Sequence, residues 1–386
     1  MKKYKVLITY VEAGMGHIVT AEAISSALEK YYPDVVEVQR CYIFSKTNDK
    51  DLIDYEKFII NAVKQSNHNN FSMYLMFFIL KIVSPMLALK VVHNLTFKKV
   101  KEKSMEIIKD YHPDMVISTH YAPLHFSVEA KEKYNLDYIT VAYCPDPNVH
   151  TWWDNRADLF LVNNQDAYNE CIKKAHFKEQ NTFLGKFILR RKLLEANITS
   201  LEMRKKYDLP EDNFTVVMAD GAYAKANLKK FAKEFLKIDK KFTLLIIAGK
   251  NEKLYDYFNK KAQEQTKIDL RVYRFIEEAY ELYKASDLFV TKAGPNAILD
   301  SVYMETPVMA NFYASPIEKT TVNLYINRWQ IGVYCQKAKK AKALLESYID
   351  NPSLLNQYKE NCVKFKQVGT GEKMFADRIV EELRKR

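Results

Sequence analysis

Short apolar runs alternate with helical patterns along this chain, and this alternation restricts its fold more than any other feature. A short unbroken apolar run is typical of a buried strand, and an apolar stripe repeating every three or four residues is typical of a helix. Ile18, Ile24 and Leu28, for example, lie on one face of an expected helix over 18–32. Strands separated by helices indicate parallel sheets with crossover helices. We therefore expect an α/β fold.

The alternation occurs twice, which indicates two tandem domains. In the first half we expect strands at 5–10, 35–38, 115–119, 138–142 and 159–162. In the second half we expect them at 214–220, 242–249, 270–276, 287–294 and 307–313. The stretch 184–212 between the halves has no strand pattern and is the expected linker. Two doubly wound sheets in tandem place a cleft between them, where the carboxyl ends of the strands bind ligands.

The charge of the chain narrows the class of partner. Its formal net charge of +11 favours nucleic acid, an anionic membrane surface or a phosphorylated substrate. The basic residues are spread along the chain without a nucleic-acid motif, which disfavours nucleic acid. The five cysteines lie far apart with no CxxC pair, so neither a disulfide framework nor a zinc site is expected. A reducing compartment fits them best. The first apolar run, "YKVLITY", is too short for a signal peptide.

One segment, Phe71–Leu95, is unusually apolar. A membrane-spanning helix needs about 20 apolar residues, and Lys81, Pro85 and Lys90 interrupt this run. It predicts two amphipathic helices broken at Ser84-Pro85. The next stretch, "TFKKVKEKSMEIIKD", adds a lysine cluster. An apolar face beside lysines fits an anionic bilayer surface. A buried helix pair with a solvated lysine face explains the composition equally well.

Four loops of the second half follow expected strands and open helices. They cover 220–227, 248–253, 291–300 and 314–323. Helix N-termini at such an edge bind phosphate through their amides and the helix dipole. Turns of any parallel sheet need glycine, so each loop alone is weak, but four together favour a nucleoside diphosphate. No P-loop or dinucleotide fingerprint is present, which disfavours ATP hydrolysis and NAD binding.

The first half offers candidate catalytic groups. In "VEAGMGHIVTAEAI", Gly14 and Gly16 precede His17 at a helix start. Histidine at this place can act as a general base near neutral pH, or simply serve as a polar residue of the helix start.

A second strand-end loop, "AYCPDPNVHTWW", offers Asp146, His150 and Trp153. The aspartate can orient or replace a histidine base, while turn formation and core packing are the alternatives. His120 and His125 flank a further loop, "STHYAPLHF", but we do not expect them to bind a metal.

Taken in order, these motifs resemble glycosyltransferase family 28, and within it the plant-type monogalactosyldiacylglycerol synthases and bacterial processive diacylglycerol glucosyltransferases. The first half matches the family through "GMGHIVTAEAI", "STHYAPL", "YCPDPNVHTWW" and "ADLFLVNN". The second half matches it through "MADGAYAKANLKK", "LIIAGKNEKL", "RVYRFIEEAYELYKASDLFVTKAGP" and "ILDSVYMETPVMANFYASPIEKT".

The resemblance implies a GT-B architecture of two Rossmann-like domains that face each other across a cleft. It implies an acceptor and membrane domain over 1–188, a donor domain over 189–365 and a final helix, 366–386, that crosses back to the first. It further implies an inverting transfer of a hexose from a UDP-sugar to diacylglycerol, with no cofactor, no metal and no nucleic acid. The enzyme is expected to be cytoplasmic and peripheral on the inner face of the cell membrane.

The resemblance also assigns residues. His17 is implied to be the base or to position the acceptor, with Asp146 as its aid. The same two motifs contribute Gly14, Gly16, His150 and Trp153. The residues implied to bind the donor are Gly221, Ala222, Gly249, Lys250, Phe275, Ile276, Lys292, Gly294, Pro295, Asn296, Asp300, Glu318 and Lys319. Those implied to meet the membrane are Phe71, Leu75, Phe78, Lys98, Lys99 and Lys101.

The chain departs from the family pattern near the expected sugar pocket. The phosphate turn "AGPN" has one glycine where the family usually has two, and Asp300 stands where glutamate is usual. Ile317 replaces a glutamine and Thr321 an asparagine. The sequence therefore leaves open whether the sugar is glucose or galactose. A peptidoglycan-type transferase, a sugar-nucleotide epimerase and a catalytically weak UDP-sugar sensor are the alternatives.

Overall fold

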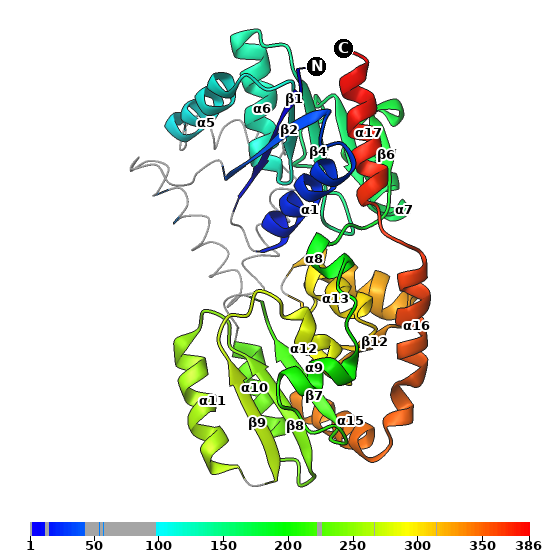
Figure 1. Cartoon of the computed structure of the whole chain (residues 1–386). Coiled ribbons are helices and arrows are strands. Elements are labelled where there is room, and N and C mark those ends of the chain that lie inside the picture. The colour runs from blue at the N-terminus through cyan, green and yellow to red at the C-terminus, as the bar shows by residue number, and fades with distance from the viewer. Residues whose placement is uncertain are drawn as a thin grey trace. The chain divides into compact units, whose positions relative to one another are not determined.

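The computed structural model describes residues 2–11, 15–42, 54, 57, 98–221, 226–265, 267–313 and 315–386 (Figure 1). The chain divides into two compact units. Unit 1 contains Met1–Leu194 together with Thr370–Arg386, and unit 2 contains Glu195–Gly369. The expected helices of Phe71–Leu95, with Phe71, Leu75 and Phe78, lie outside the described residues, as do Gly14 and Ala222.

Unit 1 is built on a parallel six-stranded sheet with the order β2-β1-β3-β4-β5-β6. The strands are β1 (Tyr4–Tyr10), β2 (Val36–Tyr42), β3 (Met115–Ser118), β4 (Ile139–Tyr143), β5 (Leu159–Val162) and β6 (Thr182–Leu184). The helices described in this unit are α1 (Met15–Tyr31), α5 (Lys98–Tyr111), α6 (Tyr121–Tyr134), α7 (Gln165–Lys173), the short 3₁₀ helix η1 (Glu179–Asn181), α8 (Arg191–Leu194) and α17 (Glu372–Arg384).

The alternation of side chains along β1 separates two cores. Val6 and Ile8 pack with α1 and α17 on one face of the sheet. Leu7 points to the other face and packs with residues of α5 and α6. Successive side chains of a strand point to opposite faces, so one apolar run supplies both cores. This is why inner strands of unit 1 such as β3 and β5 are continuous apolar runs rather than alternating ones.

Helix α17 comes from the end of the chain but belongs to unit 1 (Figure 1). It packs against α1, and Phe375 makes edge contacts with Tyr143 at 5.1 Å between ring centroids. The Tyr32 hydroxyl donates to Asp377 at 2.7 Å, and the Leu189 amide donates to Glu372 at 2.6 Å. Apolar packing and buried hydrogen bonds therefore attach the C-terminus to the first sheet.

Unit 2 repeats the arrangement with the parallel order β12-β11-β10-β7-β8-β9. The strands are β7 (Thr215–Ala219), β8 (Phe242–Ile247), β9 (Ile268–Tyr273), β10 (Leu288–Lys292), β11 (Val308–Phe312) and β12 (Gly332–Tyr334). The α-helices are α9 (Ser200–Lys206), α10 (Ala226–Phe235), α11 (Glu252–Glu264), α12 (Tyr280–Lys284), α13 (Pro295–Tyr303), α14 (Pro316–Thr321), α15 (Ala338–Asp350) and α16 (Asn356–Gln367). A π-helix η2 (Val322–Arg328) and a 3₁₀ helix η3 (Pro352–Leu355) complete it.

All ten predicted strands are present, with ends shifted by a few residues. Two of the four edge strands, β6 and β12, were not predicted, because each has only three residues and no recognisable pattern. Glycine is required in β12, since a Cβ at Gly332 would lie 1.8 Å from the carbonyl oxygen of Val308. Within the described ranges, each helix is too short or too polar to cross a bilayer.

Candidate active site

The candidate site of unit 1 lies at the carboxyl edge of its sheet. His17 is in the first turn of α1, directly after β1, and Thr119 and His120 follow β3. The loop that carries Asp146 and His150 follows β4. Because carboxyl ends of parallel strands share one edge, residues more than 100 positions apart meet here.

His17 is held in a single orientation by the loop after β3. Its Nδ1 lies 2.7 Å from the carbonyl oxygen of Thr119, and the Thr119 hydroxyl donates to the His17 carbonyl at 3.1 Å. A carbonyl only accepts, so Nδ1 carries the proton and Nε2 of the neutral ring is the basic nitrogen. Burial lowers the pKa of His17, and the hydrogen bond to Thr119 opposes this only in part. The ring is therefore neutral at pH 7 and able to accept a proton.

An aromatic cluster surrounds this histidine. The His120 ring packs edge-on against His17, with 4.8 Å between centroids. Tyr121 lies 4.1 Å from the His120 ring and 5.3 Å from His150. Trp152 covers Tyr121 at 5.1 Å. Two histidines, His120 and His150, thus contact Tyr121, and His17 joins the cluster through His120. Sequence reasoning singled out only His17 and His150 as site residues.

The other two histidines are also fixed as neutral rings. His120 caps α6 by accepting the Ala122 amide on Nδ1 at 3.2 Å. His150 accepts the Trp152 amide on Nδ1 at 3.3 Å. Burial, and then the proximity of His17, lowers the pKa of His150 to about 3. His150 is therefore uncharged near pH 7 and does not repel a proton that moves to His17.

A buried ionic network supports the loop that carries His150. His125 Nδ1 lies 2.8 Å from Asp154, and both side chains are fully buried. Arg156 donates to Asp154 at 2.7 Å and to Glu129 of α6 at 2.8 Å. Although burial opposes it, hydrogen bonding from His125 and Arg156 lowers the pKa of Asp154 to about 2. His120 and His125, which flank the same loop, thus have different hydrogen-bond partners, the Ala122 amide and Asp154.

Asp146 sits in a turn that is clamped by one amide. The Asn163 side chain donates to the carbonyl oxygens of Cys144, Pro145 and Asp146, at 3.3, 3.2 and 3.3 Å. Trp153 is buried, with 2% of its surface exposed, and stacks 6.0 Å from His150. Trp153 is thus a core residue, as one of the two sequence interpretations expected. The pairing of Asp146 with His17 stays a prediction.

In unit 2 the predicted donor loops adjoin at the carboxyl edge of the second sheet. The Lys292 amide donates to Asp220 at 2.9 Å, which joins the ends of β10 and β7. The Lys292 side chain passes both glycines, since a Cβ at Gly221 or Gly294 would lie 3.8 or 3.7 Å from its Cε. Gly221 also has φ +76°, which favours glycine.

Lys292 connects these loops to a third. Its Nζ lies 2.5 Å from Glu318, which is 8% exposed in the first turn of α14. Gly294 caps α13, Pro295 occupies the first turn, and no acidic residue lies there. The start of this helix, which includes Asn296, is the positive end of the helix dipole and suits a phosphate. Asp300 lies buried one turn further along α13.

The loops after β8 and β9 also meet. Lys250 lies 5.7 Å over the ring of Phe275, and Phe275 is 43% exposed. Gly249 has φ +61°, as the turn into α11 requires. Ile276 is half-buried and Lys319 is exposed.

The structure shows where the two residues that differ from the family pattern, Ile317 and Thr321, lie. Thr321 is fully buried and its hydroxyl donates to the Ile317 carbonyl at 3.3 Å, within its own helix. This hydroxyl is used by the backbone, so it does not replace an asparagine amide as a pocket donor. Ile317 is half-buried.

The lysines of α5 differ among themselves. Lys98 and Lys99 are exposed. Lys101 lies 3.2 Å from Glu129 of α6, with 12% of its side chain exposed. Val100, Met105 and Ile108 bury the other face of α5. This part of the segment is a packed helix with lysines at its exposed start.

Two family descriptions match the chain, one in each half. Residues 17–186 match the monogalactosyldiacylglycerol (MGDG) synthase family, and residues 199–365 match the glycosyl transferases group 1. The resemblance to these glycosyltransferases is confirmed. The first match begins at His17 and contains the whole aromatic cluster, while the second contains the Lys292 and Lys250 loops.

Individual relatives are distant but extensive. Monogalactosyldiacylglycerol synthase 2 of Arabidopsis thaliana is 25% identical over 383 residues, covering 94% of this chain and 77% of its own. A processive diacylglycerol beta-glucosyltransferase of Bacillus mycoides is 23% identical over 365 residues, covering 93% and 89%. An N-acetylglucosamine transferase of Thermoanaerobacter that acts on a pyrophosphoryl-undecaprenol is 24% identical, but over only 54% of this chain and 59% of its own.

Solved structures agree on the fold. HepE of Anabaena in complex with UDP-glucose has a TM-score of 0.59 at 12% identity, covering 99% of this chain and 100% of its own. Two parallel six-stranded sheets with helices and this likeness establish the predicted GT-B fold. Fold and family matches together support glycosyltransferase activity for this chain.

Proposed function

We propose that the chain transfers a hexose from a UDP-sugar to the hydroxyl of diacylglycerol, with inversion, at the inner face of the cell membrane. The observation that carries the proposal is the neutral His17, whose Nδ1 is committed to Thr119 and whose Nε2 is basic. The relatives that cover most of the chain act on diacylglycerol by their names, and HepE binds UDP-glucose.

In the proposed reaction, the acceptor hydroxyl attacks the anomeric carbon while His17 Nε2 takes its proton. A new C–O bond forms as the bond to the UDP oxygen breaks, and UDP leaves with that electron pair. Base catalysis of this kind is typically worth about 10²–10⁴-fold. Asp146 is the proposed aid of His17. His150 shapes the acceptor side, and the buried Trp153 supports it by stacking on its ring.

The donor is proposed to bind at the loops of unit 2. The N-terminal end of α13, at Gly294, Pro295 and Asn296, faces the diphosphate with the positive end of its helix dipole, together with Lys292 and Lys250. Lys292 pairs with Glu318 at 2.5 Å, so it can move between this carboxylate and a phosphate oxygen. The other residues assigned to the donor are Gly221, Ala222, Gly249, Phe275 and Ile276, Pro295, Asp300 for the ribose, and Glu318 with Lys319 for the sugar.

We propose that the membrane is contacted by Lys98 and Lys99, at the exposed start of α5, and by Phe71, Leu75 and Phe78 of the preceding segment. Lys101 contributes least, because Glu129 already balances its charge.

A second acceptor class is favoured by one relative. The Thermoanaerobacter N-acetylglucosamine transferase acts on a pyrophosphoryl-undecaprenol acceptor, so an acceptor of that kind is the alternative for this chain. The coverage of that relative is smaller than that of the diacylglycerol enzymes. Diacylglycerol is therefore the proposal.

The test is direct synthesis. Purified protein is incubated with diacylglycerol in mixed anionic vesicles, with UDP-glucose and UDP-galactose in separate reactions, and lipid products are identified by mass. A hexosyl-diacylglycerol from one donor supports the proposal and identifies the sugar. If neither donor yields product while UDP binds, the acceptor assignment is wrong.

A further inference from the structure

Helix α10 presents lysines to solvent on the side opposite the core. Lys230 and Lys233 are exposed and Lys229 is half-buried. The apolar side of the helix is fully buried in the core of unit 2 through Leu228, Phe231, Ala232 and Phe235. The helix is therefore fixed by its core face, and its charges face outward.

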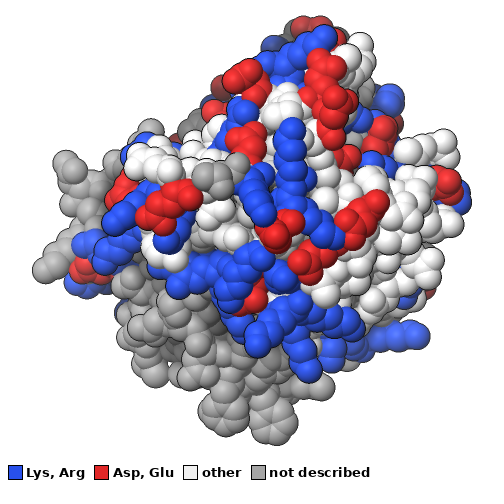
Figure 2. Space-filling view, turned by 90° about the horizontal axis from the view of Figure 1, so that it is seen from below, with Lys and Arg blue, Asp and Glu red and all other residues white. Residues whose placement is uncertain are grey.

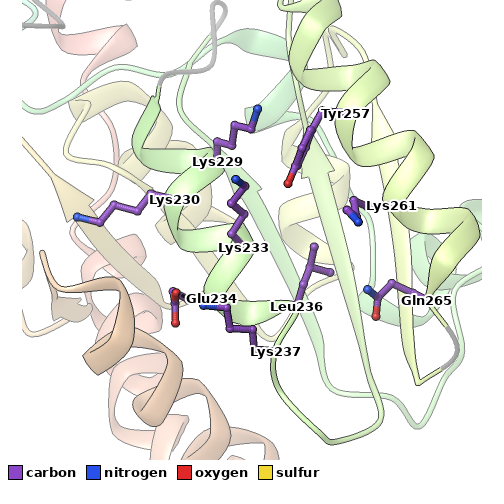
Figure 3. A pocket seen from close by; sticks show the side chains of 9 residues that line it. All are labelled: Lys229, Lys230, Lys233, Glu234, Leu236, Lys237, Tyr257, Lys261 and Gln265. Atoms are coloured by element: carbon purple, nitrogen blue, oxygen red, sulfur yellow. Dashed lines mark hydrogen bonds and ion pairs between the residues drawn. The ribbon is translucent and has the colours of Figure 1, made fainter.

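These lysines line a hollow between α10 and α11 (Figure 3). The hollow has a volume of about 730 Å³, and five of its nine lining residues are lysines. Its only acidic lining residue is Glu234. The five lysines are Lys229, Lys230, Lys233, Lys237 and Lys261. A concave surface with this charge favours an anionic partner.

Tyr257 forms the aromatic wall of the hollow. In Figure 3, Lys229 and Lys233 extend from α10 toward this ring. Their ammonium groups lie 3.8 and 5.3 Å from the ring centroid. The ring attracts both cations and holds them close to each other. An amphipathic tyrosine among lysines suits the headgroup level of a bilayer, where one end of the ring is apolar and the other is wet.

Three of the five lysines have no ionic partner in the described part of the chain. Among the described residues, Lys229, Lys230 and Lys233 form no ion pair. Lys237 pairs with Glu234 at 2.5 Å, and Lys261 pairs with Glu264 at 2.5 Å. The pKa of Glu234 is lowered first by that hydrogen bond from Lys237 and further by the charges of Lys339 and Lys342. Lysines of α15 therefore act on the same carboxylate as Lys237.

Helix α15 packs against α10 and continues the charged area. Lys339 and Lys340 are exposed there, whereas Lys342 pairs with Glu346 at 3.0 Å. Figure 2 shows Lys and Arg side chains gathered over a broad area of one face of the molecule. We call Lys229, Lys230, Lys233, Lys339 and Lys340 the lysine face.

We propose that the lysine face binds the surface of an anionic lipid bilayer. Basic residues on an amphipathic helix are typical of proteins attracted to anionic lipids. No arginine lines the hollow, so the forked donors that read individual phosphates are absent from it. Lysines act as point charges and suit the diffuse field of a membrane. Nucleic acid is less suited, because single strands usually need several stacking aromatics and the hollow has one.

The inference rests on the proposed function, since an acceptor that resides in the bilayer requires the donor-binding unit to work close to it. It adds a membrane contact in unit 2 that is separate from the lysines of α5. Each lysine near an anionic surface strengthens partitioning by about fivefold. Removing three should therefore weaken it by roughly a hundredfold.

The experiment compares vesicle binding of two variants with equal charge loss. The test variant is Lys229→Gln/Lys230→Gln/Lys233→Gln. The control is Lys133→Gln/Lys205→Gln/Lys364→Gln, which removes exposed lysines outside the face. The full chain is sedimented with phosphatidylcholine vesicles that contain or lack phosphatidylglycerol, without sugar nucleotide. UDP binding by calorimetry reports that each variant is folded.

We expect the test variant alone to lose binding to phosphatidylglycerol vesicles, and a Lys229→Arg/Lys230→Arg/Lys233→Arg variant to keep it. Equal loss in the test and control variants would mean that only net charge matters, and this would overturn the inference. Unchanged binding in the test variant would overturn it as well. So would a test variant that keeps vesicle binding but loses binding to a DNA oligonucleotide.

The proposed function is measured separately. Sugar transfer is assayed with diacylglycerol in neutral detergent micelles, where anionic attraction plays no part. If sugar is transferred in micelles but vesicle binding does not depend on the lysine face, the further inference is wrong and the proposed function stands. Vesicle binding that depends on the lysine face, with no transfer from either UDP-sugar, refutes the proposed function alone.

Discussion

The neutral His150 should make unit 1 sensitive to acid. Burial and the nearby His17 lower the pKa of His150 from 6.5 to about 3. Below about pH 6.5, His150 therefore binds a proton in the unfolded chain but not in the folded chain. Its contribution to the free energy of unfolding is fully present above about pH 6.5 and is lost as the pH falls below that value. Each pH unit in this window costs about 1.4 kcal/mol, which gives about 2 kcal/mol at a pH near 5. Partial exposure of the ring reduces this to about 1–2 kcal/mol.

The variant His150→Asn removes the titrating group and keeps an acceptor for the Trp152 amide. Urea unfolding of unit 1 is followed near pH 7.5 and near pH 5 by the fluorescence of Trp152 and Trp153, in a Trp329→Phe background. We expect the acid-induced loss to be smaller in His150→Asn by about 1–2 kcal/mol. The control, His176→Asn, changes an exposed histidine of the same unit and should leave the loss as it is. An equal loss in His150→Asn and the parent protein would refute the reasoning.

Three further predictions concern the two candidate sites and the second sheet. His17→Ala should lower kcat by about 10²–10⁴-fold while calorimetry shows unchanged UDP binding. Near-normal turnover of His17→Ala would contradict the base assignment. In the parent protein, the rate should fall at acid pH as His17 becomes protonated, and this fall should occur below pH 6.5 because burial lowers the pKa of His17. Lys292→Ala should weaken UDP-sugar binding by about 10–100-fold through loss of a charged hydrogen bond, whereas Lys260→Ala, at an exposed position of α11 with no assigned donor role, should change it much less. Calorimetry distinguishes the two, and equal effects would exclude a special role for Lys292. Gly332→Ala should destabilise unit 2 by about 3 kcal/mol in urea unfolding, since its Cβ would collide with the Val308 carbonyl; a loss below about 1 kcal/mol would show that β12 can shift.

The central strands of both sheets were predictable because they are buried on both faces. Such strands consist of continuous apolar residues, as in "FTLLII" of β8. The edge strands β6 and β12 lack this signal, since three residues with one open side need no apolar pattern. The two helices within the expected linker 184–212 were not predicted either, because α8 and α9 are short and strongly basic.

The candidate site was predictable only where one motif carries it. His17 follows its own strand and two glycines, so local sequence identifies it. The importance of His120 and Tyr121 depends on their distance from His17 and His150, which the sequence does not contain. Asp220 could have been found as a polar residue that ends an apolar run before Gly221, yet its partner, the Lys292 amide, is a backbone group. The lysine face joins α10 and α15, whose lysines are more than 100 residues apart.

The place of α17 in unit 1 has a consequence for the order in which the protein is made. A ribosome delivers Glu195–Gly369 before it delivers Thr370–Arg386, so unit 2 has all its strands while unit 1 still lacks one helix. Until then the partners of Phe375, Ile379 and Leu383 in the first core stay uncovered. A chain that stops early keeps unit 2 complete and leaves an open apolar surface on unit 1. A chain that lacks α17 therefore exposes apolar surface that chaperones and proteases recognise, whereas a chain that contains it does not.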